Sequence, residues 1–194
     1  AWTSSAEDAK NRPTKVAIEF EEGVPIAIDG KIMPLFEIIE TANKIAGENG
    51  IGRIDTIENR MIGLKSREIY EVPGANLLIY GHKALEELVL TKDEILFSEY
   101  MSTKYADLIY NALWQEPLRE DMDQAIDNMQ LRVTGKVVLK LFKGSILPLS
   151  RESDYSLHDI EQISFEDKEN DQKEVEGMIK YHGLQAAIYQ KLTK

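Results

Sequence analysis

Apolar and polar residues alternate near the start of the chain. From Lys15 to Phe20 every second residue is apolar, and a second apolar run extends from Val24 to Ile28 after the break Glu21–Gly23. A period of two is typical of a strand with one buried face, and a short polar break containing glycine indicates a hairpin. We therefore predict an antiparallel pair of edge strands over residues 15–28.

A period close to 3.6 residues follows this hairpin and predicts a helix. Pro34 suits the first turn of a helix, and the apolar residues after it share one face until Gly47 and Gly50 end the pattern. The Gly50-Ile51-Gly52 run follows this helix instead of preceding one. It is therefore interpreted as a helix stop and turn, not as a phosphate loop.

Three more helices are predicted between residues 75 and 130. One extends from about Ala75 to Leu90, one begins at Thr91, and one is opened by Pro117. Thr91 with Glu94 forms a capping box, which strengthens the second of these predictions. The polar pair Ser102-Thr103 predicts an interruption within that helix. The tyrosines and Trp114 of residues 100–114 fall at helical spacings and are expected to be core residues.

Alternation returns in the C-terminal third of the chain. Residues 134–142 and 145–150 predict a second hairpin that adds to the first sheet. The acidic segment 152–171 is expected to form loops with a short strand at 163–165. From Gly183 onward the apolar residues Leu184, Ile188 and Leu192 form a narrow stripe on a short helix.

These patterns predict an α+β fold: a small, mostly antiparallel sheet packed with several helices, and a protruding C-terminal helix. Residues 1–13 are polar and are expected to form a linker or former domain boundary. Residues 14–182 are expected to form the main domain, and residues 183–194 a C-terminal oligomerisation helix.

The stretch from Gly50 to Gly74 contains more polar groups, of more varied kinds, than a strand needs for packing alone. Both signs of charge, amides and hydroxyls alternate there with isoleucines, and several glycines allow a close approach of backbone. Such a stretch suits the binding of a polar small molecule.

The same stretch resembles the signature of the argininosuccinate synthase family. The resemblance rests on "GIGRID", "ENR", "KSR" and "YE-x-PG" at fixed spacing between residues 50 and 74, and it covers roughly residues 13 to 180. It also includes "IEFEEGVPIAIDGK" (18–31), "KYADLIYNALWQEPLRE" (104–120), "VTGKVVLKLFKG" (133–144) and "YSLHD" (155–159).

The resemblance implies that Glu58 and Tyr70 contact citrulline. A carboxylate only accepts hydrogen bonds and so suits the α-ammonium group, while a phenol offers an apolar wall and one hydroxyl. Taken alone, Glu58 equally fits a solvated carboxylate paired with Arg60 or Lys65, and Tyr70 fits a core tyrosine. The chain departs from the family at Glu68, where glycine is usual, and at Val72, where threonine is common.

Other polar residues of this stretch are expected to support the ligand contacts from behind or to form a ladder of exposed ion pairs. In the first case they would orient Glu58 or meet another domain. None is assigned to catalysis. They are Arg53, Asp55, Asn59, Arg60, Lys65 and Arg67.

Charge and missing motifs limit the function further. A formal charge of −11 argues against a nucleic-acid partner, and the chain contains neither a GxxxxGK[ST] loop nor the Ser-Gly-Gly-x-Asp type of loop with which the family grips ATP. The resemblance therefore implies the C-terminal part of the enzyme, without its nucleotide-binding half. Citrulline, aspartate and ATP with magnesium would be substrates of the complete protein, and this part alone is expected to be inactive.

Composition and spacing support two further expectations, and the resemblance implies a third. The chain has no cysteine, no secretory start and no apolar run long enough for a membrane span, which agrees with a cytoplasmic protein. His82, His158 and His182 lack metal-binding spacing, so no metal site is expected. The family is tetrameric, which implies a homotetramer joined by the C-terminal helix. A non-catalytic oligomerisation domain is the alternative function.

Overall fold

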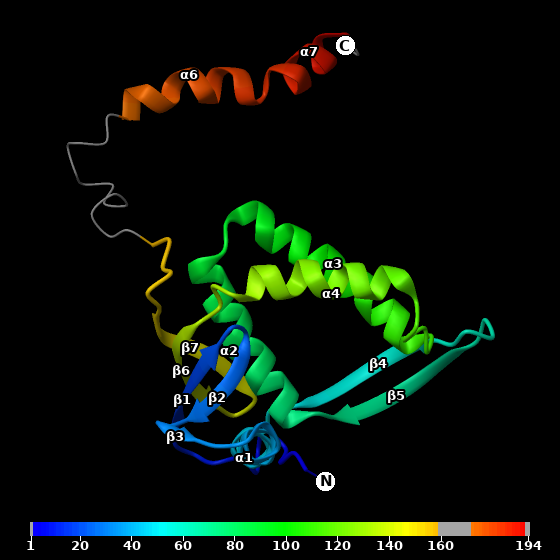
Figure 1. Ribbon diagram of the computed structural model, residues 1–194, viewed down its shortest axis with the longest axis vertical. Coiled ribbons are helices and arrows are strands. Elements are labelled where there is room, and N and C mark those ends of the chain that lie inside the picture. The colour runs from blue at the N-terminus through cyan, green and yellow to red at the C-terminus, as the bar shows by residue number, and fades with distance from the viewer. Residues whose placement is uncertain (1, 159–171, 193–194) are drawn as a thin grey trace. The chain divides into compact units, whose positions relative to one another are not determined.

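The computed structural model describes residues 2–158 and 172–192 and divides the chain into two compact units, Ala1–Leu157 and His158–Lys194. The first unit contains a sheet, four helices and a separate two-stranded ribbon (Figure 1). It includes the N-terminal segment expected to be a linker, in which Thr3 and Ala9 are buried.

The main sheet confirms the predicted α+β fold. Within the described residues it has five strands in the order β3-β2-β1-β6-β7, and every neighbouring pair is antiparallel. The strands are β1 (Thr14–Glu21), β2 (Val24–Ile28), β3 (Lys31–Ile32), β6 (Gly135–Phe142) and β7 (Ser145–Glu152).

The second hairpin adds to the first, as predicted, but the prediction that β1 is an edge strand is wrong. Residues Thr14–Phe20 pair with β6 along almost their whole length, so β1 lies in the middle of the sheet. This pairing joins segments more than one hundred residues apart, and a local pattern of apolar residues does not reveal which partner a strand will find.

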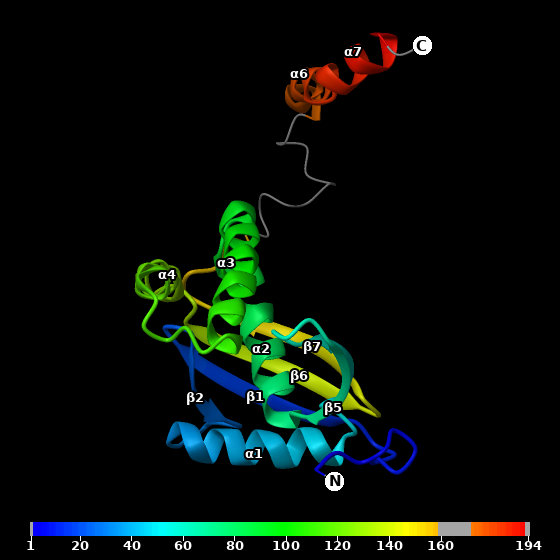
Figure 2. The same cartoon turned by 90° about the vertical axis from the view of Figure 1, so that its right-hand side faces the viewer.

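Helices α1 (Leu35–Glu48) and α2 (Pro73–Val89) pack with the sheet around one hydrophobic core (Figure 2). Ile18, Ile38, Leu77 and Leu139 are fully buried there, one from each of four different elements. At Gly81 the backbone of α2 comes so close to the sheet that a Cβ atom would lie 3.4 Å from the side chain of Ile18. The predicted stripe of α1 is buried at Ile38, Ala42 and Ala46, whereas Leu35 and Ile39, expected on the same face, are exposed.

Helices α3 (Lys92–Tyr110) and α4 (Pro117–Gln130) pack together around a smaller cluster. Its buried residues are Met101, Leu108, Met122 and Met129. The predicted capping box opens α3: the Thr91 hydroxyl accepts from the Glu94 backbone N–H at 3.3 Å, and the Glu94 carboxylate accepts from the Thr91 N–H at 2.9 Å.

Two predictions for α3 are wrong. The helix is continuous through Ser102 and Thr103, and the Thr103 hydroxyl donates to the Glu99 carbonyl one turn earlier, 3.0 Å away. Of the aromatic residues expected in the core, Tyr100, Tyr110 and Trp114 are exposed, and only Tyr105 packs against the buried cluster.

In the second unit, α7 (Leu184–Leu192) forms the predicted C-terminal helix. It is preceded by α6 (Gln172–His182), which the sequence analysis did not predict. The short strand expected at residues 163–165 lies outside the described residues.

The capping box at the start of α3 yields a stability prediction. Replacing Thr91 with alanine removes an acceptor for a helix-end N–H, and we expect it to lower the free energy of unfolding by about 1 kcal/mol in urea titrations. Thr103→Ala is the matched control, because Thr103 lies inside the same helix and caps no donor; its effect should stay within about 0.5 kcal/mol. Equal losses for the two variants would contradict the capping role.

Candidate functional site

The polar stretch singled out in the sequence forms a two-stranded ribbon of β4 (Arg53–Asn59) and β5 (Lys65–Glu71). These strands pair with each other and with no other strand of the described chain. Gly63 has φ +80° in the turn between them. At the base, a Cβ atom on Gly52 would lie 2.2 Å from the Pro73 Cα atom, so only glycine fits there.

The register of the ribbon gives it two chemically different faces. Tyr70 lies opposite Ile54, Glu68 opposite Thr56, and Ser66 opposite Glu58. Because side chains alternate along a strand, these even-numbered residues share one face, and the odd-numbered residues share the other.

Glu58 and Tyr70 lie in contact on the even-numbered face. The Tyr70 hydroxyl donates a hydrogen bond to Oε1 of Glu58, and this bond raises the pKa of Tyr70 above its ordinary value. The second oxygen of Glu58 accepts from the hydroxyl of Tyr110 at 3.3 Å. The Glu58 side chain is only 16% exposed, whereas Tyr70 as a residue is 41% exposed. A partly buried carboxylate therefore lies beside an accessible aromatic ring.

Arg60 completes this cluster and forms ion pairs with two carboxylates, those of Glu58 and Glu68. Its guanidinium lies 3.1 Å from Oε2 of Glu58 and also donates to Glu68, while its Nε donates to the Ser66 hydroxyl at 2.7 Å. The hydrogen bond to Glu68, followed by contributions from Tyr110 and Glu58, raises the pKa of Arg60. One guanidinium against two carboxylates leaves a net negative charge, so the cluster favours a cationic ligand group.

The other polar residues that were expected to support Glu58 lie on the odd-numbered face or at the base and do not orient it. Asp55 accepts hydrogen bonds from Nε and Nη2 of Arg67, which lowers the pKa of Asp55 and raises that of Arg67. Lys65 donates to Asn59 at 2.6 Å. Of these candidates, only Arg60 forms an ion pair with Glu58.

The base of the ribbon is tied to the N-terminal segment. The Glu71 carboxylate accepts from the backbone N–H groups of Trp2 at 2.8 Å and Thr3 at 3.3 Å, and these bonds with Arg53 lower the pKa of Glu71. Arg53 in turn donates to the carbonyl of Thr3 at 2.7 Å. Arg53 therefore fastens the ribbon to the body of the domain.

Sequence reasoning missed three residues of the cluster: Ser66, Glu68 and Tyr110. Ser66 and Glu68 could have been found from the period of two, which places them on the face of Glu58 once the turn at Gly63 is known. Tyr110 lies 52 residues from Glu58 in the chain, and nothing in its local sequence distinguishes it from its neighbours on α3.

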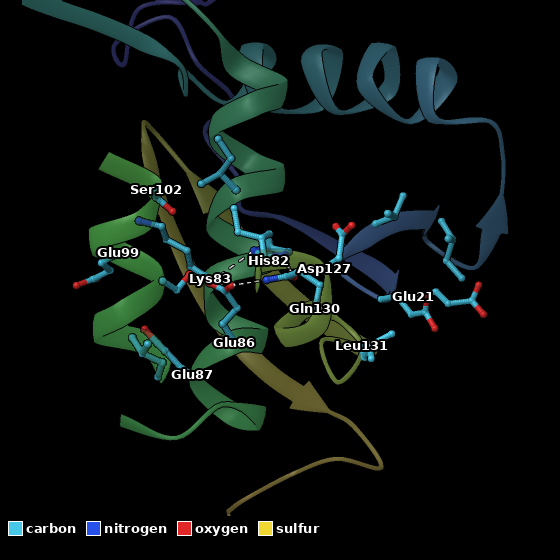
Figure 3. A pocket seen from close by; sticks show the side chains of 18 of the residues that line it. Glu21, His82, Lys83, Glu86, Glu87, Glu99, Ser102, Asp127, Gln130 and Leu131 are labelled. Carbon is cyan, nitrogen blue, oxygen red and sulfur yellow. Dashed lines mark hydrogen bonds and ion pairs between the residues drawn. The ribbon is translucent and has the colours of Figure 1, made fainter. Parts of the chain in front are cut away.

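A separate groove of about 1490 Å³ lies among the β1–β2 turn, α2, α3 and α4 (Figure 3). His82 and Gln130 face each other inside it with ring and amide atoms 2.7 Å apart, and Gln130 also donates to Glu86 at 3.0 Å. Neither Glu58 nor Tyr70 lines this groove.

Among residues 2–158 and 172–192, no three His, Cys, Asp or Glu side chains gather closely enough to hold a metal ion. No helix there has the length and apolar character required to cross a membrane.

The hydrogen bond from Tyr70 yields a prediction on pH. Because the pKa of Tyr70 is raised in the folded protein, this bond contributes stability fully below the unfolded-state tyrosine pKa of about 10, and the contribution is lost as the pH rises through the folded pKa. In NMR titrations of ¹³C-labelled tyrosine rings, we expect Tyr70 to ionise at higher pH than tyrosine in the unfolded chain. Glu58→Ala should lower the pKa of Tyr70 toward the unfolded-state value, and an unmoved Tyr70 would contradict the assignment.

Comparison with known proteins identifies the family of this chain. The model of the family described as "Arginosuccinate synthase C-terminal domain" matches residues 1–189. The chain is 55% identical to the argininosuccinate synthase of Methanococcus maripaludis and 54% identical to that of Methanocaldococcus jannaschii, in each case over 194 residues. These matches cover 100% of the chain and 49% of each relative, so the chain spans about half the length of the curated relatives that it matches. The chain therefore belongs to the argininosuccinate synthase family and corresponds to its C-terminal domain.

Proposed function

We propose that this chain is the citrulline-binding half of an argininosuccinate synthase, a ligase that joins citrulline to aspartate at the expense of ATP. The observation that carries the proposal is the contact of Tyr70 and Arg60 with the carboxylate of Glu58 on one face of the ribbon. In this proposal Glu58 binds the α-ammonium group of citrulline, and Tyr70 forms one wall of the site.

The geometry supports this assignment in two ways. The net negative charge of the cluster attracts an ammonium group. A carboxylate has about four acceptor positions, and Tyr70, Tyr110 and Arg60 occupy three of them on Glu58, so about one position stays open to the ligand. Because the Tyr70 hydroxyl gives its hydrogen to Glu58, its oxygen stays able to accept a hydrogen bond from the ligand. The exposed ring of Tyr70 also offers apolar surface to the methylene groups of citrulline.

The reaction that the family resemblance implies has two steps. The ureido oxygen of citrulline attacks the α-phosphate of ATP and releases pyrophosphate, and the amine of aspartate then displaces AMP. We assign ATP with its magnesium ion to the nucleotide-binding half of the complete protein. The residues of this chain bind and orient citrulline, and we propose that the chain alone does not catalyse ligation, because positioning the two reactants requires both halves.

The binding role of Glu58 is testable in the complete protein. Glu58→Gln keeps the size of the side chain and removes its charge, and we expect the KM for citrulline to rise by about 10- to 100-fold, because a hydrogen bond to a charged group contributes about 1.5–3 kcal/mol. Tyr70→Phe should raise the same KM by a smaller factor, while the KM for ATP stays within about twofold.

Asp55→Asn is the matched control for Glu58→Gln. Asp55 is a carboxylate of the same strand on the opposite face of the ribbon, paired with Arg67, so its loss should leave the KM for citrulline within about twofold. Similar effects of the two substitutions would refute a site confined to the face of Glu58 and Tyr70.

We propose further that α6 and α7 mediate assembly into a homotetramer. The same surface would serve the alternative function, that of a non-catalytic oligomerisation domain. Both helices expose large apolar side chains, which supports this proposal. Examples are Ile179 on α6 and Leu184, Ile188 and Leu192 on α7. α7 has no buried residue among the described ones. Apolar surface of this kind is stabilised when another chain removes it from water.

If the chain assembles through these helices, a single charge placed in the apolar stripe of α7 should weaken the assembly. Ile188→Glu places a carboxylate within the apolar stripe and should reduce the mass of the particle measured by light scattering after size exclusion. The control is Gln190→Glu, which adds the same charge to the same helix two residues away, off the Leu184–Ile188–Leu192 stripe. A chain ended after Leu157 should dissociate as well, and an unchanged oligomer for it would overturn the proposal.

A further inference from the structure

Tyr110 reaches the proposed citrulline site from outside the ribbon. It is the last residue of α3, and its hydroxyl lies 3.3 Å from Oε2 of Glu58, the oxygen that Tyr70 does not contact. The same phenol lies close enough to the Arg60 guanidinium to contribute to the raised pKa of Arg60. One side chain thus touches both charged groups beside the proposed ligand.

The position of Tyr110 is set by the end of its helix. Leu108, two residues earlier, is buried in the cluster shared with α4, and the side chain of Asn111 closes the helix by donating to the Asp107 carbonyl at 2.8 Å. The next residue, Ala112, has φ +58° and turns the chain away. Tyr110 itself is 49% exposed, so its ring contributes little to the core and its hydroxyl is left to act on Glu58.

The ribbon has few other contacts that fix it. Its strands pair only with each other among the described residues, and a two-stranded ribbon by itself is marginally stable. Arg53 and Glu71 hold its base. Between residues 54 and 70, the described part of the chain offers one side-chain hydrogen bond from outside the ribbon, and that bond comes from Tyr110.

We infer that Tyr110 is a positioning residue of the proposed citrulline site and acts through Glu58. The inference rests on the proposed function. Tyr70 holds Oε1 of Glu58, and Tyr110 with Arg60 holds Oε2, so the carboxylate is fixed against rotation from both sides. A fixed carboxylate loses less conformational freedom when the ligand arrives, and the ligand therefore binds more tightly.

The test compares Tyr110→Phe with the unmodified protein, in the complete enzyme that carries this chain as its C-terminal half. The substitution keeps the ring and removes only the hydroxyl. We expect the KM for citrulline to rise about fivefold to tenfold, near the lower end expected for a hydrogen bond to a charged group. The value of kcat, the KM for ATP and the midpoint of thermal unfolding should stay unchanged. Tyr100→Phe, an exposed tyrosine on the same helix, is the control and should change none of these quantities.

A double-mutant cycle separates positioning from a general structural role. If Tyr110 acts through Glu58, Tyr110→Phe should lower kcat/KM for citrulline in the unmodified protein and have no further effect when combined with Glu58→Ala. An effect of the same size in both backgrounds would overturn the inference, as would a Tyr110→Phe enzyme with the unmodified KM. These two results differ from failure of the proposed function. If the proposed function were wrong, the unmodified complete protein would show no citrulline-dependent formation of AMP.

Discussion

The register between β4 and β5 is the constraint on which the proposed site depends. Side chains alternate along a strand, so a shift of one residue in β5 would move Tyr70, Glu68 and Ser66 to the face opposite Glu58. The turn at Gly63 and the tight approach of Gly52 to Pro73 fix the two ends of the ribbon and so fix this register. The hydrogen bond from Tyr70 to the Glu58 carboxylate follows from it.

The hydrophobic core supports this register from a distance. Pro73, at the base of the ribbon, begins α2, whose residues Leu77 and Leu85 are fully buried against the sheet. The ribbon is also contacted by α3, which is anchored by the buried side chain of Leu108 and ends in Tyr110. The exposed ribbon is thus attached to two rigid helices, and its polar face needs no apolar core of its own.

The distribution of charge fits a division of the proposed reaction between two halves of a protein. This chain carries a net charge of −11, and its candidate site has an excess of one carboxylate over the guanidinium of Arg60. Such a site favours the ammonium end of an amino acid and disfavours a triphosphate. In the proposed enzyme, the nucleotide is bound by the half that the curated relatives possess beyond the length of this chain.

Local sequence patterns determined the α+β class, the helices α1 to α4, the capping box at Thr91 and the stretch 50–74, because each depends on residues close together in the chain. They also brought Glu58 and Tyr70 to attention, since the motif that carries the family resemblance is contiguous. Only the tertiary structure decided that β1 is central, that Arg60 alone of the expected supporting residues pairs with Glu58, and that Tyr110 contacts the same carboxylate. Those outcomes depend on pairing and packing between segments that are distant in the chain. Such contacts stabilise the fold without producing a periodic pattern in the local sequence, so the sequence alone does not reveal them.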